Sequence, residues 1–326
     1  MAAAIELRGV RKTFGAKVAV DSLDLTVPEG GLYGFIGPNG AGKTTTIRMI
    51  MSILFSDEGE VQVLGHGSAL DAKDRIGYLP EERGVYKKMK VWEFLRFMAV
   101  LKGVDGSQAR GLVKGWLEKV GLGEVEQKKC EELSKGMQQK IQFIAAVIHK
   151  PDLLILDEPF SGLDPVNMRL LRDLVLEEHG RGATVIFSTH VMVQAEQICE
   201  NVVMIHEGRK RLDDTLGDVR RRFDPRTIRF EPLGDAADVP ALKAVQGVTG
   251  VRLENGAYEI ALGEGVSPAD AIARLAAASP ASGIELHRPS LEDIFIAIVQ
   301  EDAADAEAAE QLRASVRAGA ALGGAR

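Results

Sequence analysis

The chain has 326 residues, with 40 Lys and Arg against 47 Asp and Glu, a formal net charge of −7 and a pI near 5.5. This acidic balance excludes a basic protein that coats nucleic acid. The composition, 45% hydrophobic and 27% charged, excludes wholesale disorder, and the length favours two domains of about 100 to 200 residues each.

Targeting and membrane segments are not predicted. Apolar runs such as 141–148 are far shorter than the roughly 20 residues that cross a bilayer. Residues 1–8 lack the basic start and apolar core of a signal peptide, so we expect a cytoplasmic protein. Cys130 and Cys199 lie in unrelated contexts, which excludes a disulfide framework and a cysteine zinc site.

Two strand-like runs open the chain, at 5–10 and 18–27, and they predict an antiparallel pair. A short apolar strand at 32–36 follows, then a glycine-rich loop at 37–42 and a helix from Lys43. The order strand, loop, helix is that of a phosphate-binding unit.

Apolar side chains recur at helical spacing from 91 to 147, which predicts a helical insertion over about 88–148. Short apolar strands then alternate with helices, which predicts a parallel sheet. The strands are expected at 153–156, 183–187 and 202–205, and the helices begin near Pro165 and Val191.

A second domain is predicted over 227–300, where the order strand, helix, strand, strand, helix, strand is the ferredoxin-like one. Asn255-Gly256 is a hairpin turn signal between its second and third strands. The tail at 301–326 is rich in alanine and acidic residues, and we expect a frayed helix followed by disorder. The strands are expected at 227–231, 248–253, 258–262 and 284–287.

Residues 37–44 fit the pattern GxxxxGKT between a predicted strand and helix. Its glycines let backbone N–H groups converge on phosphate oxygens, Lys43 reaches the β- and γ-phosphates, and the Thr44 hydroxyl binds Mg²⁺. The alternative, a glycine-rich turn in a chain with 35 glycines, leaves Gly-Lys-Thr at the helix start unexplained. The candidate nucleotide-binding residues are Gly37, Asn39, Gly40, Ala41, Gly42, Lys43, Thr44 and Thr45.

The apolar strand at 153–156 delivers two carboxylates at its end, Asp157 and Glu158. Asp157 can hold Mg²⁺, directly or through water, while Glu158 can polarise an attacking water. Strands often end in acidic residues because a solvated loop begins there. The pair is therefore strong evidence for a catalytic site only together with the phosphate loop that precedes it in the chain.

Three further segments point to a family: Leu-Ser-Lys-Gly-Met at 133–137, Ser-Gly-Leu-Asp at 161–164, and Thr-His at 189–190. Together with the two motifs above, and in the same order, they resemble the ATP-binding cassette (ABC) ATPases, the motor subunits of ABC transporters. The resemblance covers residues 5–216. It implies an α/β fold over 1–222: a P-loop ATPase core with a mixed sheet, an antiparallel β subdomain and a helical insertion.

The resemblance also implies ATP and Mg²⁺ as ligands and a dimer that holds two ATP molecules between its copies. Ser134 and Gly136 would bind the γ-phosphate of ATP on the other copy, Asp164 would lie in the loop that crosses the dimer, and His190 would contact the γ-phosphate. Phe14 matches the aromatic residue that stacks on adenine. A core phenylalanine of the first strand pair is the competing interpretation of Phe14.

Two departures from the family pattern stand out. The signature usually written LSGGQ has Lys135 and Met137 in place of a glycine and the glutamine. Where the family has a glutamine before the helical insertion, this chain has Glu81, which would lie near Mg²⁺ and the attacking water. These variants, with Leu-Glu-Asp-Ile-Phe at 291–295, look like the NatA-like export ATPases, which carry a small C-terminal domain.

We therefore expect an ATP-hydrolysing subunit of a bacterial exporter of Na⁺ or a drug. It would act as a dimer on a separate membrane permease docked near residues 81–86, at the inner face of the cell membrane, with no nucleic acid partner. A soluble ABC ATPase acting on ribosomes or DNA is the alternative, disfavoured by the single cassette and the acidic balance; Glu158 argues against a regulatory module with negligible turnover. The predicted catalytic residues are Glu158, His190 and Glu81, and the predicted metal ligands are Thr44, Asp157 and Glu81.

Overall fold

The computed structural model describes residues 2–82, 84–223, 226–234, 237–254 and 256–302. The described chain forms two compact units, one of residues 2–216 with 295–302, the other of Gly217–Ile294. The predicted turn residue Asn255 and the predicted tail from 303 onward lie outside the described residues.

The first unit opens with a three-stranded antiparallel sheet in the order β2-β1-β4. The predicted pair is confirmed as β1 (Ala3–Phe14) and β2 (Lys17–Pro28). The third strand, β4 (Glu58–Val63), was not predicted, because only Val61 and Val63 in it are apolar and its other four residues are exposed.

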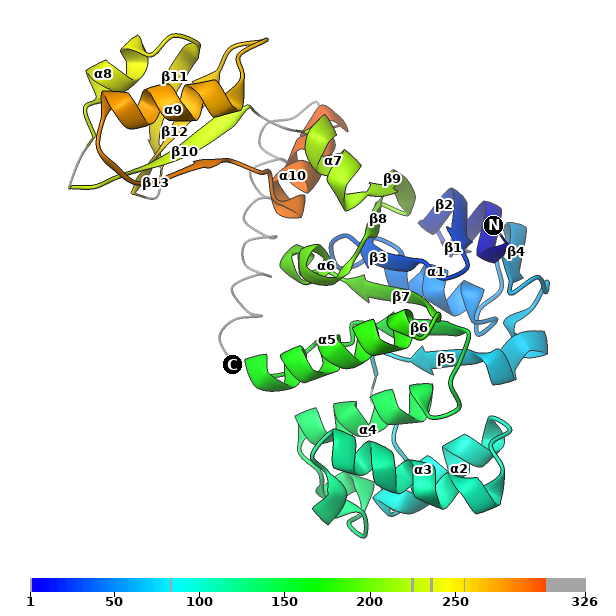
Figure 1. Ribbon diagram of the computed structural model, residues 1–326. Helices are drawn as coiled ribbons and strands as arrows, with labels where there is room; N and C mark the ends of the chain where they lie inside the picture. The colour runs from blue at the N-terminus through cyan, green and yellow to red at the C-terminus, as the bar shows by residue number, and fades with distance from the viewer. Residues whose placement is uncertain (1, 83, 224–225, 235–236, 255, 303–326) are drawn as a thin grey trace. The chain divides into compact units, whose positions relative to one another are not determined.

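A six-stranded sheet, ordered β5-β6-β7-β3-β8-β9, forms the centre of this unit (Figure 1). Five strands are parallel and β9 is antiparallel to β8, so the predicted mixed sheet is confirmed. Every residue of β3, β6 and β7 is buried, which explains their apolar sequences. The strands are β3 (Leu32–Ile36), β5 (Ile76–Leu79), β6 (Leu153–Asp157), β7 (Thr184–Thr189), β8 (Asn201–His206) and β9 (Arg209–Thr215).

The carboxyl ends of these parallel strands lead into the loops that carry the predicted motifs. The helices that follow β3, β6 and β7 are α1 (Lys43–Ile50), α5 (Pro165–Gly180) and α6 (Met192–Ile198). The helical insertion lies between β5 and β6 (Figure 1) and contains α2 (Val91–Leu101), α3 (Gly106–Lys119) and α4 (Lys135–Val147).

The second unit contains a four-stranded antiparallel sheet in the order β11-β12-β10-β13, which is the ferredoxin-like arrangement. Its core gathers apolar side chains such as Phe230 and Ile260 from one face of the sheet. No described helix is long and apolar enough to cross a membrane. From residue 216 the chain runs α7 (Leu216–Arg222), β10 (Thr227–Pro232), α8 (Val239–Ala244), β11 (Val248–Glu254), β12 (Ala257–Leu262), α9 (Pro268–Ala278), β13 (Ala281–Leu286) and α10 (Leu291–Asp302). The part of α10 from Phe295 belongs to the first unit.

Candidate functional site

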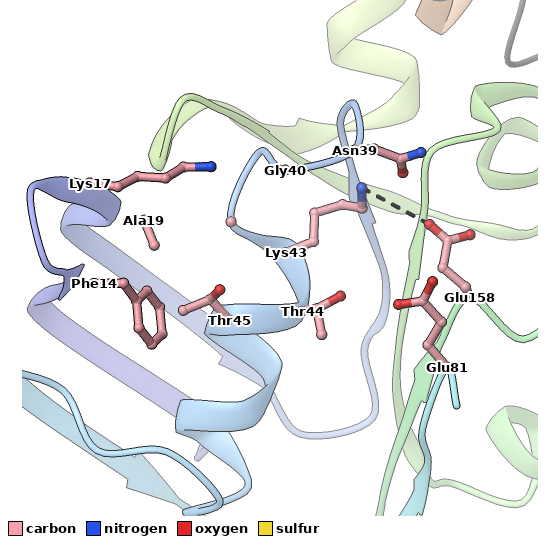
Figure 2. A pocket seen from close by; sticks show the side chains of 11 residues that line it. Phe14, Lys17, Ala19, Asn39, Gly40, Lys43, Thr44, Thr45, Glu81 and Glu158 are labelled. Atoms are coloured by element: carbon pink, nitrogen blue, oxygen red, sulfur yellow. Dashed lines mark ion pairs between the residues drawn. The ribbon is translucent and has the colours of Figure 1, made fainter. Parts of the chain in front are cut away.

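A cavity of about 340 Å³ lies at the start of α1 and brings together most of the predicted nucleotide-binding residues (Figure 2). Two of its lining residues, Lys17 and Ala19, were missed in the sequence. The signal was there, because residues two apart on a strand share a face and both follow the turn after Phe14. The lining residues are Phe14, Lys17, Ala19, Asn39, Gly40, Gly42, Lys43, Thr44, Thr45, Glu81 and Glu158.

The loop before α1 needs glycine at two of its positions. Gly37 has φ +148°, and a Cβ there would lie 2.1 Å from the carbonyl oxygen of Ile205. Gly42 has φ +110°, and its Cβ would lie 2.6 Å from the carbonyl oxygen of Ala19. Both are rare conformations for other residues and both are closely packed, so the loop is held against its neighbours before any ligand arrives.

Lys43 is a buried cation at the first residue of α1. Its Nζ donates hydrogen bonds to the carbonyl oxygens of Gly37, at 2.7 Å, and Pro38, at 3.1 Å, and lies 4.0 Å from Glu158 Oε1. Burial lowers the pKa of Lys43, while the carboxylates of Glu158 and Asp157 raise it. A buried ammonium group beside a helix N-terminus favours an anion in the cavity.

Asp157 and Thr44 fit the requirements of a Mg²⁺ ion. Thr44 Oγ1 lies 3.3 Å from Asp157 Oδ1, which also accepts a hydrogen bond from Ser188 Oγ. Asp157 Oδ2 is buried and has no hydrogen-bond partner among the described residues, so this oxygen keeps unused capacity to accept a bond. Burial raises the pKa of Asp157, with the bonds from Ser188 and Thr44 opposing it.

Among the described residues no three His, Cys, Asp or Glu side chains form a metal-binding cluster. Mg²⁺ does not require one, because it usually takes one or two carboxylates together with water and substrate phosphates. The hydroxyl of Thr44 and the free oxygen of Asp157 match that donor set.

Glu158 and His190 form a directly bonded pair. His190 Nδ1 lies 2.9 Å from Glu158 Oε1, and this hydrogen bond raises the pKa of His190 despite its partial burial. Glu158 has φ +49°, a left-handed conformation that its backbone N–H supports by donating to Ser188 Oγ at 3.1 Å. The backbone therefore holds the Glu158 carboxylate toward the cavity at some conformational cost.

Glu81 lies just beyond the end of β5, and its carboxylate faces the cavity on the same side as Glu158 (Figure 2). Phe14 is the last residue of β1, just before the turn to β2, and 52% of its surface is exposed, so it is not a core residue of the strand pair. Its ring lines the cavity, and Lys12 Nζ lies 5.8 Å from the ring centroid. An exposed ring at the cavity is available to stack on a base.

Seven predicted site residues do not line this cavity, and two of these, Asp157 and His190, contact the lining residues Thr44 and Glu158. Gly37 and Ala41 support the loop from within the fold, and Ser134, Gly136 and Asp164 lie at helix starts elsewhere in the unit. Ser134 Oγ accepts from Met137 N at 3.3 Å at the start of α4. Asp164 Oδ1 accepts from Val166 N at 3.0 Å and Asn167 N at 2.9 Å at the start of α5, and the bond from Asn167 lowers the pKa of Asp164.

These last two segments lie side by side. A Cβ on Gly136 would lie 3.6 Å from Leu163 Cδ2 and 3.6 Å from Asn167 Nδ2. Ser134 and Asp164 are exposed. The predicted site residues thus fall into two groups, one around the cavity and one at the neighbouring starts of α4 and α5.

Comparisons with known proteins agree with this architecture. Residues 20–161 match the ABC transporter family, and residues 215–299 match the C-terminal domain of DrrA1-3-like ATP-binding proteins. The chain is 42% identical to the uncharacterized ABC transporter ATP-binding protein YhaQ of Bacillus subtilis (strain 168), over 88% of this chain and 95% of that one.

Two further relatives extend the similarity. The daunorubicin/doxorubicin resistance ATP-binding protein DrrA of Streptomyces peucetius is 30% identical over 94% of this chain and 97% of its own. A solved structure described as the ATP binding subunit of an ABC transporter superposes with a TM-score of 0.63 at 30% identity, covering 68% of this chain and 93% of that one.

Proposed function

The chain belongs to the ATP-binding proteins of ABC transporters, and from that premise we propose that it drives a separate membrane permease of an exporter. Its activity is ATP hydrolysis with Mg²⁺. The observation that carries the assignment of residues is the connected set around the cavity, in which Lys43, Glu158 and His190 are linked by contacts of 4.0 Å and 2.9 Å.

We assign the chemistry as follows. Lys43 and the backbone N–H groups at the start of α1 bind the phosphates of ATP. Asp157 Oδ2 and Thr44 Oγ1 would hold Mg²⁺, which neutralises phosphate charge during the transfer. Glu158 accepts the proton of the attacking water, and His190, whose imidazole contacts Glu158, holds that carboxylate in place.

Ser134, Gly136 and Asp164 complete the site of a second copy in this proposal. Their place outside the cavity, on exposed helix starts, supports a role across an interface. The dimer would then hold ATP between the phosphate loop of one copy and the start of α4 of the other.

The permease is proposed to dock on an apolar surface formed by Tyr86 and the exposed side of α2. Four large apolar side chains are exposed there, and the Tyr86 ring packs edge-on against Phe94 and Phe97, each at 5.9 Å between centroids. Exposed apolar side chains gathered in one place mark a contact surface. The exposed residues are Tyr86 at 55%, Phe97 at 43%, Val100 at 44% and Leu101 at 58%.

This surface begins a few residues after Glu81, which lines the cavity. A permease bound there would sense the nucleotide through residues 81–86, and it would hold the chain at the inner face of the membrane. Drug efflux is the favoured substrate class because of the name of DrrA; export of Na⁺ is the alternative that follows from the NatA-like variants.

The test is co-expression with candidate permeases, beginning with any protein of several membrane spans that a neighbouring gene encodes, followed by co-purification and ATPase assays with candidate drugs and Na⁺. We expect the permease to co-purify and a substrate to stimulate hydrolysis. A Phe97→Ser/Leu101→Ser variant should lose the permease while it retains nucleotide binding. Stimulation by ribosomes or DNA, without any bound membrane protein, would favour the soluble alternative instead.

A further inference from the structure

A second cavity, of about 340 Å³, lies in the Gly217–Ile294 unit. Its volume is at the lower end of the range for small-molecule sites, about 300 to 1,000 Å³. Two segments line it: α7 contributes two arginines, and the segment after β13 contributes a histidine and a third arginine. The lining residues are Gly217, Arg220, Arg221, Leu286, His287, Arg288 and Pro289.

The cavity lining contains no acidic residue. The lining is therefore positive although the whole chain has a net charge of −7. Arg221 pairs with Asp218 one turn away on α7, but their side chains are 75% and 44% exposed, so the pair contributes little and can be exchanged for a better anion. Arg288 is exposed, and no described residue makes a hydrogen bond or ion pair with it.

The backbone that presents His287 and Arg288 is fixed at both ends. His287 N donates to Thr227 O at 2.8 Å, which ties the end of β13 to β10. Ser290 N donates to Asp293 Oδ2 at 3.0 Å, and Asp293 N donates to Ser290 Oγ at 3.1 Å, which closes a capping box at the start of α10. Pro289 between them is buried.

Carboxylates near the cavity lie outside its lining, which holds three arginines. Asp293 is occupied in the capping box and Asp218 in its ion pair, which leaves Glu292 in the first turn of α10 as a further carboxylate in this segment. The backbone that presents these cationic side chains is therefore already ordered. Less conformational entropy of the protein is lost when a ligand binds.

We propose that this cavity binds a phosphate-bearing ligand, either a soluble phosphate monoester or the headgroup of an anionic phospholipid. Guanidinium groups donate paired N–H bonds that match phosphate oxygens, and three of them converge here from two segments. This site is separate from the ATP cavity in residues and in structural unit.

The test uses the full chain carrying Lys43→Ala, so that the phosphate loop does not compete for the probe. Glycerol 3-phosphate is titrated by calorimetry, and vesicles of phosphatidylglycerol in phosphatidylcholine are tested by co-sedimentation. The variants are Arg288→Gln, Arg221→Gln and Arg288→Lys. Arg252→Gln is the matched control, because Arg252 is an exposed arginine of the same unit that does not line the cavity.

We expect Arg288→Gln to weaken binding at least about tenfold, since a hydrogen bond to a charged group is lost. The affinity of Arg288→Lys should fall between those of the parent chain and Arg288→Gln, because lysine keeps the charge and loses the paired donors. Arg252→Gln should stay within about twofold of the parent chain. Binding of glycerol 3-phosphate alone supports a soluble ligand, and binding of anionic vesicles alone supports a lipid.

Two outcomes would overturn the proposal. One is the absence of binding to both probes at millimolar concentration. The other is equal weakening by Arg288→Gln and Arg252→Gln, which would mean that only diffuse positive charge is sensed. Thermal unfolding of each variant shows whether it is folded, and the three arginine positions, 221, 252 and 288, are all exposed.

Discussion

The two groups of residues assigned to ATP chemistry are held by the fold in opposite ways. Around the cavity, Lys43, Asp157 and Glu158 are buried, with 5%, 1% and 8% of their surfaces exposed. Lys43 lies 4.0 Å from Glu158, and Ser188 bonds both the Glu158 backbone and the Asp157 carboxylate. At the starts of α4 and α5, Ser134 and Asp164 are exposed, and their side chains cap the helices.

Buried charges are costly unless they are paired, so the first group can persist only as a connected set positioned by the fold of one chain. The second group does not need paired charges, because the side chains of Ser134 and Asp164 are exposed to water. They can therefore face another molecule. This difference separates two kinds of defect. Variants of the buried group should fail in the isolated chain, whereas variants of the exposed group should fail only where two copies meet.

The largest effect is expected from Lys43→Ala. It removes the buried cation, and we expect the affinity for ATP to fall by more than about a hundredfold, because bonds between charged groups are lost. Equilibrium titration of the isolated chain measures this. Lys114→Ala, at an exposed position of α3, is the control and should bind normally. Unchanged affinity in Lys43→Ala would remove the phosphate-loop assignment.

Glu158→Gln should slow hydrolysis at least about a hundredfold, which is the lower end of what a positioned base contributes. ATP binding should persist, and an ATP-bound dimer should accumulate. The hydrogen bond to the Glu158 carboxylate raises the pKa of His190, so a neutral amide at position 158 should lower that pKa, which NMR titration can follow. Near-normal turnover would mean that Glu158 is not the base.

Ser134 separates a structural role from a functional one. Ser134→Ala should cost about 1 kcal/mol of unfolding free energy, measured in urea, because the cap of α4 is lost. Ser134→Asn should keep this stability, since asparagine caps helices as well as serine. If Ser134 binds ATP on a second copy, both variants should lose about tenfold in ATPase rate while monomer binding stays normal. Full activity in Ser134→Asn would mean that Ser134 only caps α4 and does not bind ATP.

The sequence was sufficient for the elements whose residues are constrained by burial or by glycine. The strand β3 was predicted to the residue, and the loop that follows it contains glycines that no other residue could replace. The strands β4, β5 and β9 were not predicted. They are short or polar edge strands whose pairing is set by neighbours far along the chain, and local patterns do not encode such pairings.

The same contrast holds for the site. A motif supplies the type of residue, and it placed Lys43 and Glu158 at the cavity. It could not show the unused oxygen of Asp157 or the exposure of Phe14, because both depend on how β1, β6 and β7 pack in three dimensions. Lys17 was missed because it belongs to no motif. It lines the cavity because it lies on the same face of β2 as Ala19.

The smallest expected effect concerns Glu81, which lines the same cavity as the buried group and yet is exposed. If its carboxylate approaches Mg²⁺, Glu81→Gln should raise the Mg²⁺ concentration for half-maximal turnover several-fold, because hard cations prefer charged oxygen ligands. Metal-free nucleotide binding should be nearly unchanged. Glu82→Gln is the matched control, since Glu82 is exposed and adjacent but does not line the cavity.

ATPase rates against Mg²⁺ for the wild type and both variants decide the role of Glu81. If the Mg²⁺ concentration for half-maximal turnover rises in Glu81→Gln alone, the Glu81 carboxylate contacts the metal. The site would then include an exposed residue beside the buried ones. Identical curves would exclude a metal contact. If the curves coincide and only stimulation by the permease is lost, then Glu81 connects the cavity to the apolar surface at Tyr86 and α2. In that case its exposure is what the role requires, because a residue that signals to a partner must be able to move when the partner binds.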